Sequence, residues 1–220
     1  MGVPAVDPSA FFYLTAEVRW FRPGRIPQEI RNWFSRGPFS LIPSTRTDRY
    51  LVFPSSEHVG VKFREQRFEV KTLVRELDLL KVGKVIRGRM ELWEKWSAGA
   101  PSVPLLFHDL SATGDRWTAV TKTRWMRVFH AEGEGIREMD PGDTRLRPEE
   151  GCDAEITEIE IGGDPFWTLG LESFGSHGSL VQQLTGTAQF LLQPVKEELQ
   201  LSESDACAYP CFLRRYLANN

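Results

Sequence analysis

The sequence has few of the features that mark several common protein classes. Its 220 residues contain three cysteines, an odd number that suits a reducing compartment better than a disulfide framework. No apolar run approaches the roughly 18 residues that a membrane-spanning helix needs. Residues 1–10 carry no basic side chain ahead of the apolar stretch from Phe11 to Leu14, so no secretory signal is expected. We therefore expect a cytoplasmic protein with no membrane partner.

An excess of positive charge is also missing. There are 27 Lys and Arg residues against 30 Asp and Glu, which gives a net charge of −3. A protein that binds nucleic acid over a broad surface is normally markedly basic, so no nucleic-acid partner is expected. The four histidines show no paired spacing, and Cys207 and Cys211 alone do not make a soft metal site. We expect these thiols to be buried on one face of a helix. Gly162-Gly163 matches no phosphate-binding loop and is expected to form a turn.

The chain does contain many candidate strands. Alternating apolar and polar side chains predict about eight of them, at 12–21, 46–53, 59–64, 67–74, 87–96, 117–129, 154–161 and 166–174. Helical spacing follows at 26–34 and 180–192, and Ser204-Asp205 is a candidate N-cap for a final helix. The pattern predicts a mainly β (α+β) fold, an antiparallel barrel or tunnel with helices packed outside. We expect one domain, 1–220, with the barrel at 12–174 and a C-terminal helical segment at 178–220.

Charged side chains share one face of these strands. In the first strand Glu17 and Arg19 lie opposite Val18 and Trp20. The same parity gathers two further sets: the basic residues Lys62, Arg64, Lys71, Lys95, Lys122 and Arg124, and the acidic residues Glu69, Glu91, Glu155 and Glu172. Because helices are available to cover the apolar face, the charged face can point into a hydrated interior. In the alternative, each strand turns this face to solvent, as in any antiparallel sheet.

Several short motifs follow one another along the strands. They are Asp48-Arg49-Tyr50, Lys62-Phe63-Arg64, Glu69-Val70-Lys71, Arg89-Met90-Glu91-Leu92-Trp93, Lys122-Thr123-Arg124 and Gly170-Leu171-Glu172. Their order resembles the CYTH-like superfamily of triphosphate tunnel metalloenzymes, and the resemblance covers Phe12 to Leu192. It implies phosphate-binding roles for Arg19, Lys62, Arg64, Lys71, Lys122 and Arg124. It also implies a Mg²⁺ or Mn²⁺ site at Glu17, Glu91 and Glu172, with Glu155 in reserve.

Four departures from the family pattern qualify the function that the resemblance implies. Thr15, Trp93 and Gly170 stand where the family has Glu, and Arg19 stands where it has Lys. The implied activity is that of a metal-dependent triphosphatase with Glu17 and Glu172 as catalytic carboxylates. Because metals offset the charge that develops in the transition state, we expect binding of a triphosphate-type polyanion, with hydrolysis weak, metal-dependent or absent.

Two other interpretations stay open. The first is a non-catalytic CYTH-like scaffold that acts as a protein-interaction module. The second is a barrel that binds a small organic anion or a pigment, although such a cavity should be apolar inside. Parity places Trp93 on the charged face, where a base, a ring system or a plug would sit.

Overall fold

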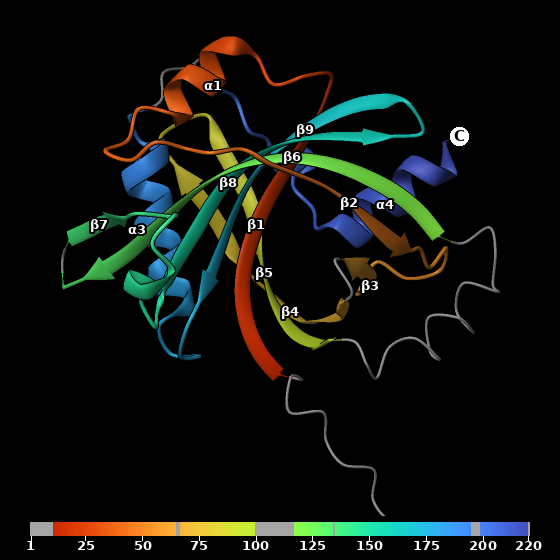
Figure 1. Ribbon diagram of the computed structural model, residues 1–220, viewed down its shortest axis with the longest axis horizontal. Helices are drawn as coiled ribbons and strands as arrows, with labels where there is room; N and C mark the ends of the chain where they lie inside the picture. The colour runs from red at the N-terminus through yellow and green to blue at the C-terminus, as the bar shows by residue number, and fades with distance from the viewer. Residues whose placement is uncertain (1–10, 65–66, 100–116, 134, 195–198, 220) are drawn as a thin grey trace, which may run out of the picture.

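The computed structural model describes residues 11–64, 67–99, 117–133, 135–194 and 199–219. Figure 1 shows how the elements are arranged. The strands are β1 (Phe11–Pro23), β2 (Ser44–Leu51), β3 (Val59–Arg64), β4 (Arg67–Val82), β5 (Ile86–Gly99), β6 (Trp117–Glu132), β7 (Gly135–Met139), β8 (Gly151–Ile161) and β9 (Asp164–Phe174). The α-helices are α1 (Gln28–Phe34), α3 (Leu180–Leu192) and α4 (Tyr209–Ala218), and the 3-10 helices are η2 (Thr144–Leu146) and η3 (Glu203–Asp205).

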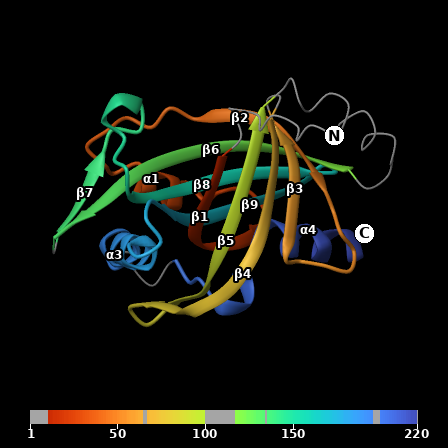
Figure 2. The same cartoon turned by 90° about the horizontal axis from the view of Figure 1, so that it is seen from below.

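Eight of the strands form a closed antiparallel barrel. Their order is β2-β3-β4-β5-β1-β9-β8-β6, and β6 pairs back onto β2 from Ser44 opposite Arg124 to Leu51 opposite Trp117. Figure 2 shows β3, β4 and β5 running steeply across the directions of β6 and β8 on the opposite wall. β7 pairs with residues 128–132 of β6, beyond the segment of β6 that pairs with β2, and takes no part in the closure. The predicted antiparallel barrel of about eight strands with helices is confirmed.

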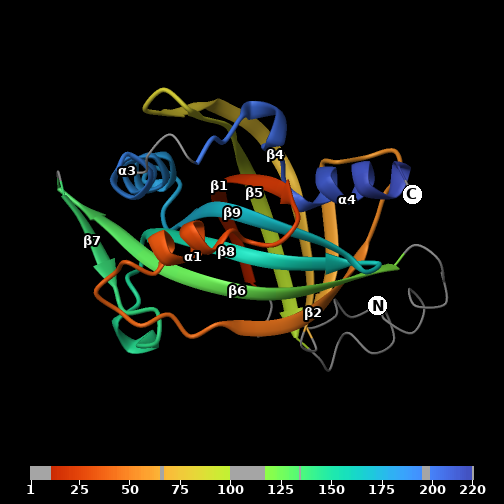
Figure 3. The same cartoon turned by 90° about the horizontal axis from the view of Figure 1, so that it is seen from above.

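The largest hydrophobic core lies outside the barrel wall. Ala16, Val18 and Trp20 of β1 are almost completely buried, in one cluster with apolar side chains of α1 and α3. α1 lies over β6 and β8 (Figure 3), and Arg31 of α1 pairs with Glu158 of β8 at 2.6 Å. Each fully buried Leu or Phe in such a cluster stabilises the fold by about 1.5–3 kcal/mol. Because the outward faces carry the apolar residues, the charged faces are left for the interior.

α4 packs its apolar face against interior-facing side chains of the barrel. Tyr209, Phe212 and Leu213 form a second cluster with Phe21 of β1 and Tyr50 of β2, joined by residues of β6 and β8. The rings of Phe21 and Phe212 stack with centroids 4.0 Å apart. One part of the interior is therefore filled by an aromatic contact between the barrel and the C-terminal helix, and charged side chains dominate the lining of the cavity that remains.

Several predicted boundaries differ from the structure. The 67–74 strand continues to Val82, and the five-residue β7 was not predicted. α4 begins at Tyr209 after Ala208, whereas Ser204-Asp205 lies in η3, so the predicted N-cap was wrong. Pro210 sits in the first turn of α4, where a missing N–H breaks no hydrogen bond.

Smaller sequence predictions have mixed outcomes. Cys207 precedes α4 and therefore shares no helical face with Cys211. Cys152 and Cys211 are buried and free, while Cys207 is half-buried. Gly162-Gly163 is a turn, and its φ angles of 60° and 93° explain the two glycines. The hairpin turn at 65–66 lies outside the described residues. Among the residues that the structure describes, no helix has the length and apolar character to cross a bilayer.

Candidate functional site

The barrel interior holds a charged cavity of about 250 Å³. Its lining contains eight basic residues: Arg19, Arg46, Lys62, Arg64, Lys71, Lys95, Lys122 and Arg124. The acidic residues of the lining are Glu17, Glu69, Asp153, Glu155 and Glu172. The structure thus brings together all six side chains predicted to bind phosphate. Strand alternation explains the gathering, because each residue occupies the inward face of its own strand and the eight strands close around a common centre.

Glu17 lies at the centre of one group of ion pairs. Its carboxylate pairs with Lys71 of β4, and Lys95 of β5 lies 3.6 Å away. Lys95 also pairs with Glu172 of β9 at 2.7 Å. Burial alone would raise the pKa of Glu17, but the ammonium groups of Lys71 and Lys95 lower it to about 2. Both carboxylates predicted to be catalytic therefore serve as partners of lysine.

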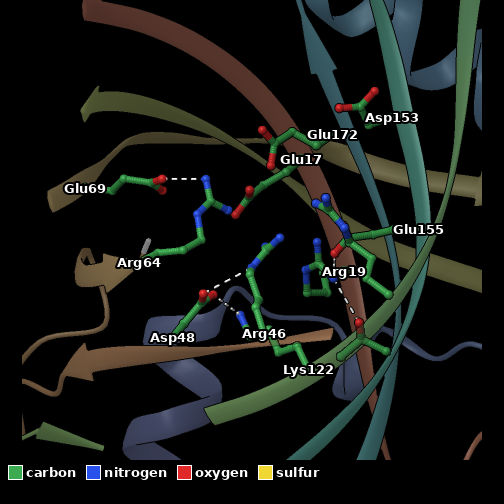
Figure 4. Close-up of polar contacts among 12 residues, drawn as sticks. Glu17, Arg19, Arg46, Asp48, Arg64, Glu69, Lys122, Asp153, Glu155 and Glu172 are labelled. Atoms are coloured by element: carbon green, nitrogen blue, oxygen red, sulfur yellow. Dashed lines mark hydrogen bonds and ion pairs between the residues drawn. The ribbon is translucent and has the colours of Figure 1, made fainter. Parts of the chain in front are cut away.

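A second group lies on the β3–β4 hairpin. Glu69 pairs with Lys62 at 2.7 Å and with Arg64 at 2.5 Å. The register places Lys62 directly opposite Glu69, which brings these side chains together across the two strands. Although burial opposes it, the two cations lower the pKa of Glu69. Figure 4 shows the Arg64 guanidinium group reaching from its strand toward Glu69.

The third group surrounds Asp48, which is 0% exposed on β2. Arg46 lies 3.1 Å and Lys122 lies 3.0 Å from its carboxylate oxygens. Lys122 also donates a hydrogen bond of 2.5 Å to the hydroxyl of Tyr50, and its ammonium group lies 3.7 Å from the ring centroid of Tyr209. Burial favours the neutral acid, but the surrounding cations lower the pKa of Asp48 to about 2.

The fourth group joins β1, β6 and β8 through Glu155. Arg19 pairs with Glu155 at 2.7 Å, and Arg124 approaches it at 3.4 Å. Arg19 also donates a hydrogen bond of 2.9 Å to Thr168. Its guanidinium group lies directly over Gly170, so that a Cβ at that position would be 2.5 Å from Cζ. A glutamate at 170 cannot coexist with this placement of Arg19.

The cavity carboxylates do not fit a resident divalent cation. Glu17, Glu69, Glu155 and Glu172 each face lysine or arginine, and Asp153 pairs with Arg147 at 2.8 Å. Mg²⁺ and Mn²⁺ need carboxylate oxygens that are free to coordinate them. Among the described residues, no three or more His, Cys, Asp or Glu side chains are grouped as metal ligands.

Glu91, the third residue predicted to hold a metal, is not part of the cavity lining. It lies opposite Glu17 in the β1–β5 register, and its carboxylate accepts a hydrogen bond of 2.9 Å from the Trp93 indole. Burial and the charge of Glu17 raise the pKa of Glu91 to about 7. In the predicted set, Glu17 and Glu172 therefore line the cavity and Glu91 does not.

Trp93 is a plug within the barrel rather than a stacking surface. It is 1% exposed, and the ammonium group of Lys71 lies 4.1 Å from its ring centroid. Its cross-strand neighbour Thr15 is completely buried. An indole thus fills this part of the interior and packs under a cavity lysine.

Sequence reasoning missed several residues of the cavity lining, among them the polar residues Arg46, Asp153 and Tyr209. Arg46 has the same parity as Asp48 and Tyr50, so the alternation of β2 contained a signal for it. Asp153 likewise shares the parity of Glu155 on β8. Tyr209 enters the cavity from α4, and no strand pattern could have indicated it. A comparison with protein-family models and with curated protein sequences found no match for this chain, so its fold and cavity carry the functional argument.

Proposed function

We propose that this protein binds a small polyanion of the triphosphate type inside the barrel. The observation that carries the proposal is the lining of one interior cavity by eight basic and five acidic residues. Arginine and lysine in such numbers are suited to phosphate oxygens, because charge-assisted hydrogen bonds are the strongest ones that side chains make. Low-dielectric walls raise the local potential further.

The size of the cavity supports a compact ligand. Sites for larger organic ligands usually measure about 300–1,000 Å³, whereas this cavity holds about 250 Å³. An inorganic polyphosphate matches that volume and the charge of the lining. A pigment or other apolar ligand would need an apolar inner wall, and Ala16, Val18 and Trp20 of β1 face outward instead.

The resemblance to the CYTH-like superfamily also supports the proposal, through the order of the basic motifs and the closed eight-stranded barrel. The same resemblance implies hydrolysis with a divalent cation. Because the cavity carboxylates are engaged by lysine and arginine, we assign no hydrolytic step and propose binding without a resident metal. In this mechanism the ion pairs hold the basic head groups in place, and the remaining N–H groups of the same lysines and arginines donate to phosphate oxygens.

The test is calorimetric titration of the full-length protein with sodium tripolyphosphate, in EDTA and again with Mg²⁺. We expect saturable binding in EDTA that weakens as NaCl is added. Arg64→Ala should weaken binding by about 1.5–3 kcal/mol, the value of a hydrogen bond to a charged group. Arg89→Ala is the control, since Arg89 is exposed and pairs with Glu76 and Glu203 outside the cavity; its affinity should match that of the wild type.

Two results would contradict this function. Absence of saturable binding under both conditions would leave only the scaffold interpretation. Release of phosphate at an ordinary enzymatic rate, about 1–10³ per second, only with Mg²⁺ and abolished by Glu17→Gln, would identify a metal-dependent hydrolase instead.

A further inference from the structure

Tyr209 carries a buried hydroxyl group without a hydrogen-bond partner. The residue is 8% exposed, and its Oη atom makes no hydrogen bond. Its ring is held firmly by an edge-on contact with Phe21 at 5.1 Å and by stacking on Tyr50 at 5.5 Å. Phenylalanine would make the same ring contacts without burying an unsatisfied polar group. Packing of α4 therefore does not explain why this residue is tyrosine.

The unpartnered hydroxyl belongs to a residue of the cavity lining. Tyr209 is part of the cavity lining, with the Lys122 ammonium group 3.7 Å and the Arg19 guanidinium carbon 5.2 Å from its ring centroid. The charges that act on the phenol come from Arg19, Glu155, Asp48 and Arg46, which belong to two of the ion-pair groups of the cavity. Burial raises the pKa of Tyr209, so the phenol keeps its proton and remains a hydrogen-bond donor.

A second donor of the cavity lining is also buried without a hydrogen-bond partner. The Nε atom of Arg124 is buried without a partner, while its terminal nitrogen lies 3.4 Å from Glu155. Among the described residues of the lining, the buried unpartnered side-chain atoms are this nitrogen and the Tyr209 hydroxyl, and both bear a proton to donate. Donors without acceptors call for a ligand that supplies acceptor oxygens, as an oxyanion does.

We propose that the Tyr209 hydroxyl donates a hydrogen bond to the bound oxyanion, beside Arg124. The inference rests on the proposed function and adds a binding residue that comes from α4 rather than from the barrel strands. Because Arg19 and Lys122 lie over the ring, the anion that they attract is drawn to the hydroxyl. The unsatisfied phenol is then a cost to folding that ligand binding offsets.

The test compares Tyr209→Phe with Tyr216→Phe, the same change on the same helix. The Tyr216 hydroxyl hydrogen-bonds the Ile161 carbonyl at 3.0 Å and Asp164 at 2.8 Å, away from the cavity. For each full-length variant we would measure tripolyphosphate affinity by calorimetry in EDTA and the midpoint of urea unfolding without ligand. We expect Tyr209→Phe to bind about tenfold or more weakly, with a midpoint equal to or above that of the wild type. Tyr216→Phe should keep its affinity and have a lower midpoint.

Each contrary result has a distinct meaning. If wild type and Tyr209→Phe bind equally tightly, the role assigned to Tyr209 is wrong and the proposed function stands. If Tyr209→Phe loses both affinity and urea midpoint, its hydroxyl has a structural role and the inference is overturned. If the wild type binds no tripolyphosphate, the proposed function fails and the inference fails with it.

Discussion

Individual residues in the cavity are arranged so that charge is balanced locally. Each of the lining carboxylates has a lysine or arginine within ion-pairing distance, and several of these pairs are buried. Removing one member of a buried pair is far more damaging than removing an exposed charge, because the remaining charge loses its compensation. The cavity lysines therefore contribute to stability as well as to the proposed binding.

Lys71→Met tests this local balance. The substitution leaves Glu17 buried without its nearest cation, so the free energy of unfolding at pH 7 should fall by about 3 kcal/mol. The pKa of Glu17 is about 2 in the folded protein and about 4.3 in an unfolded chain, so this stabilisation exists above about pH 4 and is lost as the pH falls toward 2. Urea unfolding measures it. The control is Lys81→Met on exposed β4 surface; equal losses in the two variants would contradict the prediction.

Glu91 should make stability depend on pH in the direction opposite to Glu17, and Glu91→Gln tests this. Burial and Glu17 raise the pKa of Glu91 to about 7, while Lys71 and the Trp93 indole oppose the shift and Glu76 adds to it. The folded protein then holds a proton that the unfolded chain releases above about pH 4.3, so stability falls as the pH rises from there to 7.

The side-chain amide introduced by Glu91→Gln cannot ionise and still accepts the indole hydrogen bond. This variant should therefore gain about 2–3 kcal/mol over the wild type at pH 8 and almost nothing at pH 4. Urea unfolding across this pH range is the measurement. Glu94→Gln, on the exposed side of β5, should follow the wild-type profile. A constant difference between Glu91→Gln and wild type at all pH values would contradict the raised pKa.

At the scale of the elements, β1 and β9 fit together because a side chain of β1 lies over a glycine of β9. Arg19 and Gly170 are cross-strand partners, and the guanidinium group occupies the space that any side chain at 170 would need. This placement over Gly170 lets Arg19 reach both Glu155 of β8 and Thr168 of β9. The basic character of the cavity thus depends on a glycine in the middle of a strand, where glycine is otherwise unfavourable.

Gly170→Ala should therefore destabilise the protein. The added Cβ would lie 2.5 Å from Arg19 Cζ, and moving that guanidinium group breaks its buried contacts, for a loss of about 1–3 kcal/mol in urea unfolding. Tripolyphosphate affinity should fall as well. Gly178→Ala is the matched control, since nothing lies within 4 Å of the new methyl group. A gain in stability at 170 would show that Arg19 adapts without loss.

At the scale of the whole molecule, the barrel places its apolar faces outside and its charged faces inside. Helices α1 and α3 bury the outer faces, and α4 fills part of the interior with aromatic side chains. Closure through β2 and β6 leaves the eight strands without an unpaired edge. A charged cavity is stable here because the hydrophobic core that holds the fold together lies on the other side of the sheet.

A ligand for this cavity should stabilise the entire fold, since the lining comes from all eight barrel strands and α4. Tripolyphosphate at about 100 times its dissociation constant should raise the free energy of unfolding by about 2.7 kcal/mol. Urea unfolding in EDTA measures the shift, with NaCl of the same ionic strength as the control. No difference between the two salts would contradict binding to the folded state.

The sequence by itself determined which residues share a face and where most of the strands and helices lie. Alternation separated Glu17 from Val18, and helical spacing predicted α3 with both ends correct, from Leu180 to Leu192. Both patterns depend on the geometry of a single strand or helix, in which neighbouring side chains have fixed directions. That is why all six predicted phosphate ligands came together once the barrel closed.

Only the tertiary structure decided how those residues are used. Strand register around the closed barrel decides three features. They are the pairing of Glu17 with Lys71, the absence of Glu91 from the cavity lining and the placement of the Arg19 guanidinium group over Gly170. Tyr209 reaches the cavity because α4 packs against β1 and β2, although Tyr209 is far along the chain from its neighbour Tyr50 in β2. Such contacts depend on closure of the barrel and on packing between distant segments, which the periodicity of one strand or helix does not encode.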